Sequence, residues 1–220
     1  MHAFMSERPS PQISSRKQPK QVRSTELVAA ILEAAAQVLA TQGASRFTMA
    51  RVAERAGVSV GSMYQYFPNK AAILFRLQSD EWRQTSDMLR GILDDQVKPP
   101  FERLHILVRA FIRSECDEAQ MRGALNDAAP LYRDTPEARA ARLSVQQSVD
   151  AFMLQVLPAA SAQTRSLAGD LMITTLSKVG KQFSTAPRSP EEIESYARAM
   201  AEMFCAYLAN LQQRPDATTG

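Results

Sequence analysis

Cysteine and histidine are scarce in this sequence of 220 residues, which holds two of each. Cys116 and Cys205 lie far apart and belong to no pairing motif, so we interpret both as small helix residues. A redox sensor would need an exposed thiolate of low pKa, which a sequence alone does not reveal. Two histidines are too few for a histidine-based metal cluster. We therefore expect neither a metal site nor a cofactor.

Catalytic motifs are also missing. The sequence contains no HExxH pair, no glycine-rich phosphate loop and no nucleophile elbow. Its acidic residues and histidines fall in no recognised catalytic spacing. We expect that the protein is not an enzyme.

Long apolar runs are absent too. No run is long enough to span a bilayer, and every segment with a helical pattern carries charges. The first 21 residues lack the continuous apolar segment of a signal peptide. We therefore expect a soluble, cytoplasmic protein that does not contact a membrane. Hydrophobic residues still make up 45% of the chain, enough for the core of one large domain or two small ones.

The sequence contains no convincing strand pattern of period two and no internal repeat. Apolar residues recur instead at helical spacing, which predicts an all-α fold of about nine helices. A second helix is expected between Thr48 and Gly57. The other helices are expected at about 25–42, 60–66, 70–94, 101–116, 118–128, 137–157, 161–183 and 190–212.

Charge is distributed unevenly along the chain. Residues 1–76 hold ten Lys/Arg and four Asp/Glu, a net charge of +6, whereas the remainder carries −3. A basic end on a slightly acidic body suggests contact with a polyanion, the alternative being a solvated basic surface. Residues 1–22 are rich in Pro, Ser and Gln, and we expect a flexible tail. Its basic residues would lie within reach of nucleic acid, namely Arg16, Lys17, Lys20 and the adjoining Arg23.

Residues 48–70, "TMARVAERAGVSVGSMYQYFPNK", have the pattern of a helix-turn-helix. Thr48 and Ser59 are positioned to cap the two short helices, because their hydroxyls can accept bonds from free first-turn N–H groups. Gly57 suits the turn between them, which requires the left-handed conformation. Ala53 is small where the helices would cross, and Met63 would help to hold the pair together. Asn69 would cap the next helix.

The second short helix would then be free to enter the major groove of DNA. Its small first residues would approach base edges, whereas its tyrosines and the following lysine would contact phosphates. The alternative is that the aromatic residues simply pack in a core, which we expect for Phe67. The predicted DNA-contacting residues are Thr48, Arg51, Val60, Gly61, Ser62, Tyr64, Gln65, Tyr66 and Lys70.

The run "FTMARVAERAGVSVGSMYQYFPNKAAIL", residues 47–74, resembles the DNA-binding signature of the TetR family of bacterial transcription regulators. The preceding "ILEAAAQVLATQGASRF", residues 31–47, resembles the same signature. The resemblance covers about residues 24–76; beyond them, only the length and the helical pattern match. It implies a DNA-binding domain over 23–70 and an effector-binding and dimerisation domain over 71–214. The tail over 1–22 is longer than the family minimum, and is either a minor-groove arm or disordered.

The resemblance further implies a homodimer on a double-stranded, palindromic DNA operator. It also implies a repressor that a small apolar or aromatic molecule releases; control by a protein partner, or activation of transcription, are the alternatives. Each apolar pocket residue can equally be ordinary core. The candidate pocket residues are Trp82, His105, Arg109, Phe111, Phe152 and Met172. The candidate dimer residues, on the last two long helices, are Leu176, Phe183, Met200, Phe204 and Tyr207.

Overall fold

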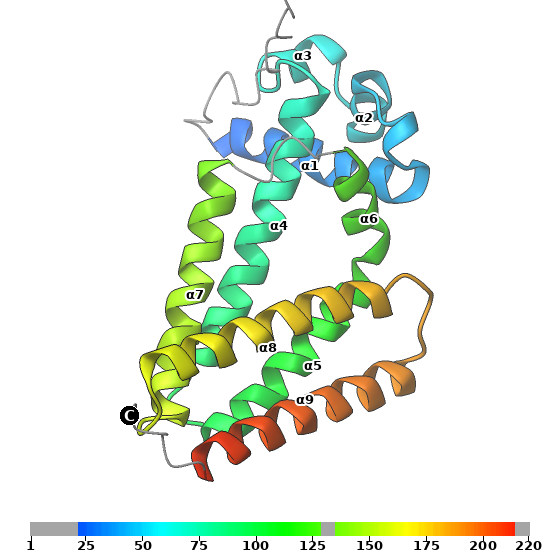
Figure 1. Cartoon of the computed structure of the whole chain (residues 1–220). Coiled ribbons are helices and arrows are strands. Elements are labelled where there is room, and N and C mark those ends of the chain that lie inside the picture. Colours follow the sequence, from blue (N-terminus) through cyan, green and yellow to red (C-terminus); the bar gives the residue numbers. More distant parts are fainter. Residues whose placement is uncertain (1–21, 129–134, 214–220) are drawn as a thin grey trace, which may run out of the picture. The chain divides into compact units, whose positions relative to one another are not determined.

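The structure is a computed structural model that describes residues 22–128 and 135–213 (Figure 1). In these residues it contains nine α-helices and one 3-10 helix, with no β-strand. The predicted all-α fold is therefore confirmed. The tail residues Arg16, Lys17 and Lys20 lie outside the described residues.

The helices agree with the sequence expectation within a few residues at each end. Three differences stand out: α1 begins three residues before its predicted start, α3 ends two residues before its predicted end, and a 3-10 helix, η1, precedes α2. The helices are α1 (Val22–Gln42), η1 (Ala44–Arg46), α2 (Met49–Ala56), α3 (Val60–Tyr64), α4 (Lys70–Leu93), α5 (Pro100–Asp117), α6 (Ala119–Ala128), α7 (Pro136–Val156), α8 (Ala162–Phe183) and α9 (Pro190–Gln213).

The described residues form two compact units. The first unit comprises residues 22–80 with 123–128, and the second comprises 81–122 with 135–213. The chain passes from one unit to the other inside α4 and inside α6. We describe each unit by itself.

In the first unit, α1 packs against α2, and α2 packs against α3. The core residues lie at helical spacing on each element, and most are fully buried; burial of each large apolar side chain contributes about 1.5–3 kcal/mol. This core includes Ile31, Ala35, Leu39, Phe47, Val52, Ala53, Met63, Phe67 and Ile73.

One finding corrects the expectation about membrane-spanning segments. The stretch Ser24–Gln42 of α1 is long and apolar enough to cross a membrane by length and composition. However, 33% of it is buried inside the protein, and the helix packs against α2. Ile31, Ala35 and Leu39 are fully buried along that face, so one face of the helix packs against the core of the first unit.

In the second unit, both α8 and α9 pack against α5, and α7 packs against α8 (Figure 1). Close approach to α8 depends on two glycines. A Cβ on Gly169 would lie 2.9 Å from Val149 Cγ1 of α7, and one on Gly180 would lie 3.0 Å from Phe111 Cε1 of α5. Larger residues at these positions would push the helices apart.

The second unit also contains a half-buried charge cluster around Arg122 of α6. Its guanidinium pairs with Glu81 of α4 at 3.1 Å, with Glu118 at 2.9 Å and with Glu115 of α5. The side chains of Arg122 and Glu81 are each 11% exposed. Burial raises the pKa of the Glu81 carboxyl above its usual value, although Arg122 acts in the opposite direction.

Candidate nucleic-acid interface

Local hydrogen bonds set the ends of the two helices in the predicted helix-turn-helix. The Thr48 hydroxyl accepts a bond from the Arg51 N–H at 3.3 Å, and the Ser59 hydroxyl accepts one from the Ser62 N–H at 3.0 Å. Gly57 has φ of 69°, and its N–H bonds back to carbonyls of α2. The predicted capping and turn roles of these three residues are therefore confirmed.

Buried residues of α2 and α3 fix which side of each helix faces outward. Val52, Ala53 and Met63 are essentially inaccessible, as is Phe67 just after α3. A helix of five residues, such as α3, is not stable by itself and depends on this packing. Met63 is its buried residue, so the other side chains of α3 lie toward the surface.

Most of the predicted DNA-contacting residues lie on that surface. Ser62 is half-buried, and its hydroxyl shares a hydrogen bond of 2.8 Å with the Ser59 hydroxyl. A hydrogen bond from the Ser62 hydroxyl to a base must therefore either replace its bond to Ser59 or form in addition to it. The exposed members of the set are Thr48, Arg51, Val60, Gly61, Tyr64, Gln65 and Lys70.

Tyr66 requires a correction, because its side chain is only 9% exposed. We expected it to face outward like Tyr64. The helix instead ends at Tyr64, and the chain tightens, with the Tyr66 N–H donating to the Met63 carbonyl three residues back. This turn directs Tyr66 inward, so its ring packs rather than forming part of the exposed face.

Among the residues that the structure describes, no packing contact requires a glycine at position 61. It lies in a helix without positive φ, and a Cβ there would meet only the Ser59 hydroxyl oxygen, at 3.9 Å. A helical glycine costs roughly 1 kcal/mol relative to alanine. Nothing in the first unit offsets that cost, which is consistent with an external surface that approaches the backbone closely.

Arg51 is held from one side only. Its Nη1 donates to Gln42 Oε1 at 2.7 Å and to the Arg46 carbonyl, while Nη2 and Nε make no hydrogen bond to a described residue. Arg46 is itself exposed, in η1. It is an additional candidate for phosphate contact that the sequence analysis missed, although a basic residue next to the motif was a visible signal.

The start of α4 completes the surface. The Asn69 side chain accepts a bond from the Ala72 N–H at 3.0 Å, as predicted for a cap. Lys70 follows as the first residue of this 24-residue helix and is exposed. A helix N-terminus carries partial positive charge, and a lysine there adds to its attraction for an anion such as phosphate.

The predicted pocket residues have mixed surroundings in the described part of the chain. Phe111, Phe152 and Met172 are buried in the core of the second unit, whereas His105 and Arg109 are exposed on α5. Arg109 pairs with Glu194 of α9 at 2.7 Å. Trp82 is half-buried. Of these six, Phe152 lines a recess in the second unit, described below.

The predicted dimer residues also have mixed surroundings. Leu176, Met200 and Phe204 are buried within the chain itself, so in this conformation they offer no surface to a partner. Phe183 and Tyr207 are half-buried. Helical periodicity shows which face is apolar, but not whether the same chain already covers it. Other apolar residues on α8 and α9 are exposed, namely Leu167, Leu171 and Met203.

Two family models match the chain. One, described as "Bacterial regulatory proteins, tetR family", matches residues 31–77 and so includes α2, α3 and the start of α4. The other, described as "Tetracyclin repressor-like, C-terminal domain", matches residues 99–211. The chain belongs to the TetR family. It is accordingly a DNA-binding transcriptional regulator with a helix-turn-helix.

Among curated proteins, the chain is similar to nucleoid occlusion factor SlmA of Vibrio campbellii and of Photobacterium profundum. Both are 36% identical to it over 83 residues. The match spans 37% of this chain and 42% of either relative, so less than half of each protein is compared.

Solved structures share the fold over most of the chain. A TetR-family regulator from Mesorhizobium loti has a TM-score of 0.64 at 20% identity, covering 85% of this chain and 98% of that one. The transcriptional regulator FadR from Bacillus subtilis, solved in complex with stearoyl-CoA, has a TM-score of 0.59 at 15% identity, with coverages of 80% and 97%. At these identities, the likeness shows the fold alone.

Proposed function

We propose that this TetR-family regulator is a cytoplasmic repressor that binds a palindromic operator as a homodimer and leaves it when a small ligand binds. The observation that carries the DNA-binding geometry is the exposed face of α3, where a helical glycine has open space in front of it. We propose the domain division that was expected from the sequence, with residues 23–70 binding DNA and 71–214 binding the effector and the partner.

In the proposed complex, α3 enters the major groove with its first turn nearest the bases. Val60 would contact a thymine methyl group, and Ser62 would bond a base edge, while Gly61 lets the backbone come close. Tyr64, Gln65 and Lys70 would bind phosphates beside the groove, as would Thr48 and Arg51. The buried Tyr66 would support this surface by packing.

A palindromic operator requires two copies of α3 about 34–36 Å apart, in successive major grooves. The exposed Leu167 and Leu171 on α8 and Met203 on α9 are the side chains that we propose for the dimer contact. The half-buried Phe183 and Tyr207 would extend it. Exposed apolar residues of this size commonly mark an interface.

Release by a ligand requires only that the ligand prefer the conformation that does not fit the operator. A preference of a few kcal/mol shifts such an equilibrium almost completely. The proposal that the effector is a small apolar or aromatic molecule draws support from the apolar core of the second unit and from the FadR fold neighbour, which was solved with stearoyl-CoA.

The test is a gel shift with the DNA upstream of the protein's own gene, against an excess of unrelated DNA. We expect a sequence-specific shift that is weakened by replacing Val60 or Ser62, together with a dimer in sedimentation. Leu171→Glu should convert the dimer to a monomer and abolish the shift. Binding to all DNA with equal affinity would contradict the proposal of a specific operator.

Control by a protein partner is a second candidate, favoured by the partial likeness to nucleoid occlusion factors. The same gel shift separates the two candidates. Release by added small molecules supports ligand control, whereas a specific shift that only a protein fraction changes supports partner control. A reporter gene under the control of the same upstream DNA then distinguishes repression from activation, since the position of the operator decides which of the two occurs.

A further inference from the structure

A fully buried arginine stands near the first turn of α5. Arg103 has 0% exposed surface, and its Nη1 donates to the Leu93 carbonyl at the end of α4. Its Nη2 donates to Gln155 Oε1 of α7, and its guanidinium lies 5.4 Å from the centre of the Phe152 ring. Among the described residues, no carboxylate lies within ion-pair distance of it. A buried charge without an opposite charge is costly, often by several kcal/mol.

The hydrogen bonds of Arg103 leave one of its three nitrogens without a partner. Its Nε is buried and makes no hydrogen bond. In a guanidinium, Nε–H and one N–H of Nη2 point in parallel from the same edge, which matches the two oxygens of a carboxylate. Gln155 supplies a single, neutral amide oxygen to Nη2. Because Nε on this edge has no partner, the edge could take two anionic oxygens.

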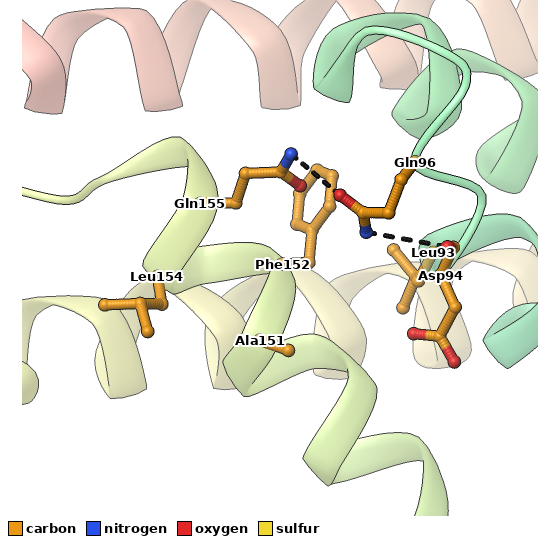
Figure 2. Close-up of a pocket in the computed structure, with 7 residues that line it drawn as sticks. All are labelled: Leu93, Asp94, Gln96, Ala151, Phe152, Leu154 and Gln155. Atoms are coloured by element: carbon orange, nitrogen blue, oxygen red, sulfur yellow. Dashed lines mark hydrogen bonds between the residues drawn. The ribbon is translucent and has the colours of Figure 1, made fainter.

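A recess of about 250 Å³ lies beside groups that contact this arginine, and Figure 2 shows the residues that line it. Its lining includes the three groups that contact Arg103, namely Leu93, Phe152 and Gln155. Gln155 is exposed, and its Nε2 donates to Gln96 Oε1 at 3.1 Å, so the two amides span the recess (Figure 2). Rotation of the Gln155 side chain would open the Arg103 edge to a molecule in the recess.

We propose that this recess binds a small monocarboxylate with an apolar body. The carboxylate takes the place of the Gln155 amide oxygen and pairs with both Nε and Nη2 of Arg103. The apolar part lies against Phe152, Leu93 and the exposed Leu154, which also line the recess. The binding step stands on the second unit alone, whereas its effect on DNA binding rests on the proposed function.

Nearby acidic residues favour a monocarboxylate over a doubly charged anion such as phosphate. The Asp94 carboxylate lines the recess but points away from the two glutamines, toward Ser148 at 3.4 Å (Figure 2). Asp95 is held by Lys98, whose hydrogen bond is the main reason that the Asp95 pKa is lowered. These two charges would repel a dianion more strongly than a monoanion.

Calorimetry on the full chain without DNA tests the binding step. The probes are benzoate and octanoate, with benzamide and octanamide as neutral molecules of the same shape. We expect either carboxylate to bind about tenfold or more tightly than its amide, since only the carboxylate forms the paired charge-assisted bonds. Equal binding of acid and amide, or no binding of any probe at 10 mM, would overturn the proposal.

Gln155→Glu provides the sharpest variant, because it places a carboxylate at the Arg103 edge from within the chain. It should raise Tm by about 2–4 °C and abolish benzoate binding. Gln147→Glu, at another exposed glutamine of α7, adds the same charge elsewhere and should leave both properties unchanged. Arg103→Met should also abolish binding, but Gln155→Glu decides if that variant fails to fold. Undiminished benzoate binding by Gln155→Glu would contradict the site.

A gel shift with octanoate then addresses regulation separately. Release of the operator by octanoate in the unmodified protein, but not in Gln155→Glu, would connect the site to the proposed function. Binding without release would leave the carboxylate site established and contradict only its role as the effector site.

Discussion

Two helical glycines, one in each compact unit, lie in opposite surroundings. A Cβ on Gly169 of α8 would come within 2.9 Å of Val149 Cγ1, so the contact between α8 and α7 requires the missing side chain. A Cβ on Gly61 of α3 would meet a single atom at 3.9 Å. Each glycine weakens its helix by about 1 kcal/mol relative to alanine. At Gly169 the packing of the same chain offsets this cost, whereas no packing contact among the described residues does so at Gly61.

Basic residues show the same contrast. In the second unit, Arg122 is surrounded by three carboxylates, and its charge is used inside the fold. In the first unit, Lys70 is exposed and contacts no described acidic residue. Arg122 therefore contributes to the structure of its own unit, whereas Lys70, at a helix N-terminus, is one of the residues that we propose for contact with DNA.

The largest effect that this comparison predicts is on stability. Gly169→Leu should lower the free energy of unfolding by about 3 kcal/mol, because the added side chain overpacks the α7–α8 contact. Gly61→Leu should fold normally and lose operator binding, since its side chain would extend into the space proposed for DNA. Urea unfolding measures the stability of both variants, and gel shifts measure their operator binding. Equal destabilisation by the two leucines would contradict the distinction between a packed glycine at 169 and an open one at 61.

Gly61→Ala is a finer version of the same comparison. It should raise the stability of the first unit by about 0.5–1 kcal/mol, since alanine favours the helix and meets no neighbour. It should nevertheless weaken operator binding about tenfold, equivalent to about 1.4 kcal/mol. Thermal unfolding measures the expected gain in stability, and operator titration measures the expected loss of affinity. Unchanged operator affinity would show that the major groove does not approach this backbone.

Lys70→Ala should have a smaller and less selective effect. It removes one phosphate contact, so the affinity for all DNA sequences should fall about fivefold. The slope of the logarithm of the binding constant against the logarithm of the salt concentration should decrease in magnitude by about one. Lys178→Ala, which removes an exposed lysine of α8, is the matched control. Fluorescence anisotropy at several salt concentrations measures both. A slope that changes equally in both variants would indicate a general charge effect.

The first unit was largely predictable because short-range features determine it. Thr48, Gly57, Ser59 and Asn69 act through neighbours no more than four residues away, which a sequence displays directly. The η1 turn was missed because three residues carry no periodic pattern. The orientation of Tyr66 was wrong because it depends on where α3 ends, and a two-residue error reverses the side that a side chain faces.

The second unit was predictable in its helices but not in its sites. Apolar spacing located α8 and α9, yet it did not distinguish residues covered by the same chain, such as Leu176, from exposed ones such as Leu171. The recess was missed because it joins the ends of α4 and α7, which are far apart in sequence. One signal was available, since Arg103 falls in register with Leu107 and Phe111 on the buried face of α5.

The smallest predicted effect concerns Glu81 in the Arg122 cluster. Its pKa in the folded protein is raised by burial above the ordinary value of 4.5, so the ionised carboxylate is less favourable in the folded state than in the unfolded state. This penalty is present at pH 8 and disappears as the pH falls through the raised pKa toward 4.5. Glu81→Gln should therefore be slightly more stable than the unmodified protein at pH 8.

The difference between the two proteins should shrink as the pH is lowered, and urea unfolding at pH 8, 6 and 4.5 measures it. Glu202→Gln removes an exposed carboxylate from α9 of the same unit and is the control. If Glu81→Gln is instead the less stable protein at pH 8, then attraction to Arg122 outweighs the cost of burial. The cluster would in that case stabilise the second unit through its charges, and the contrast with Lys70 would be sharper still.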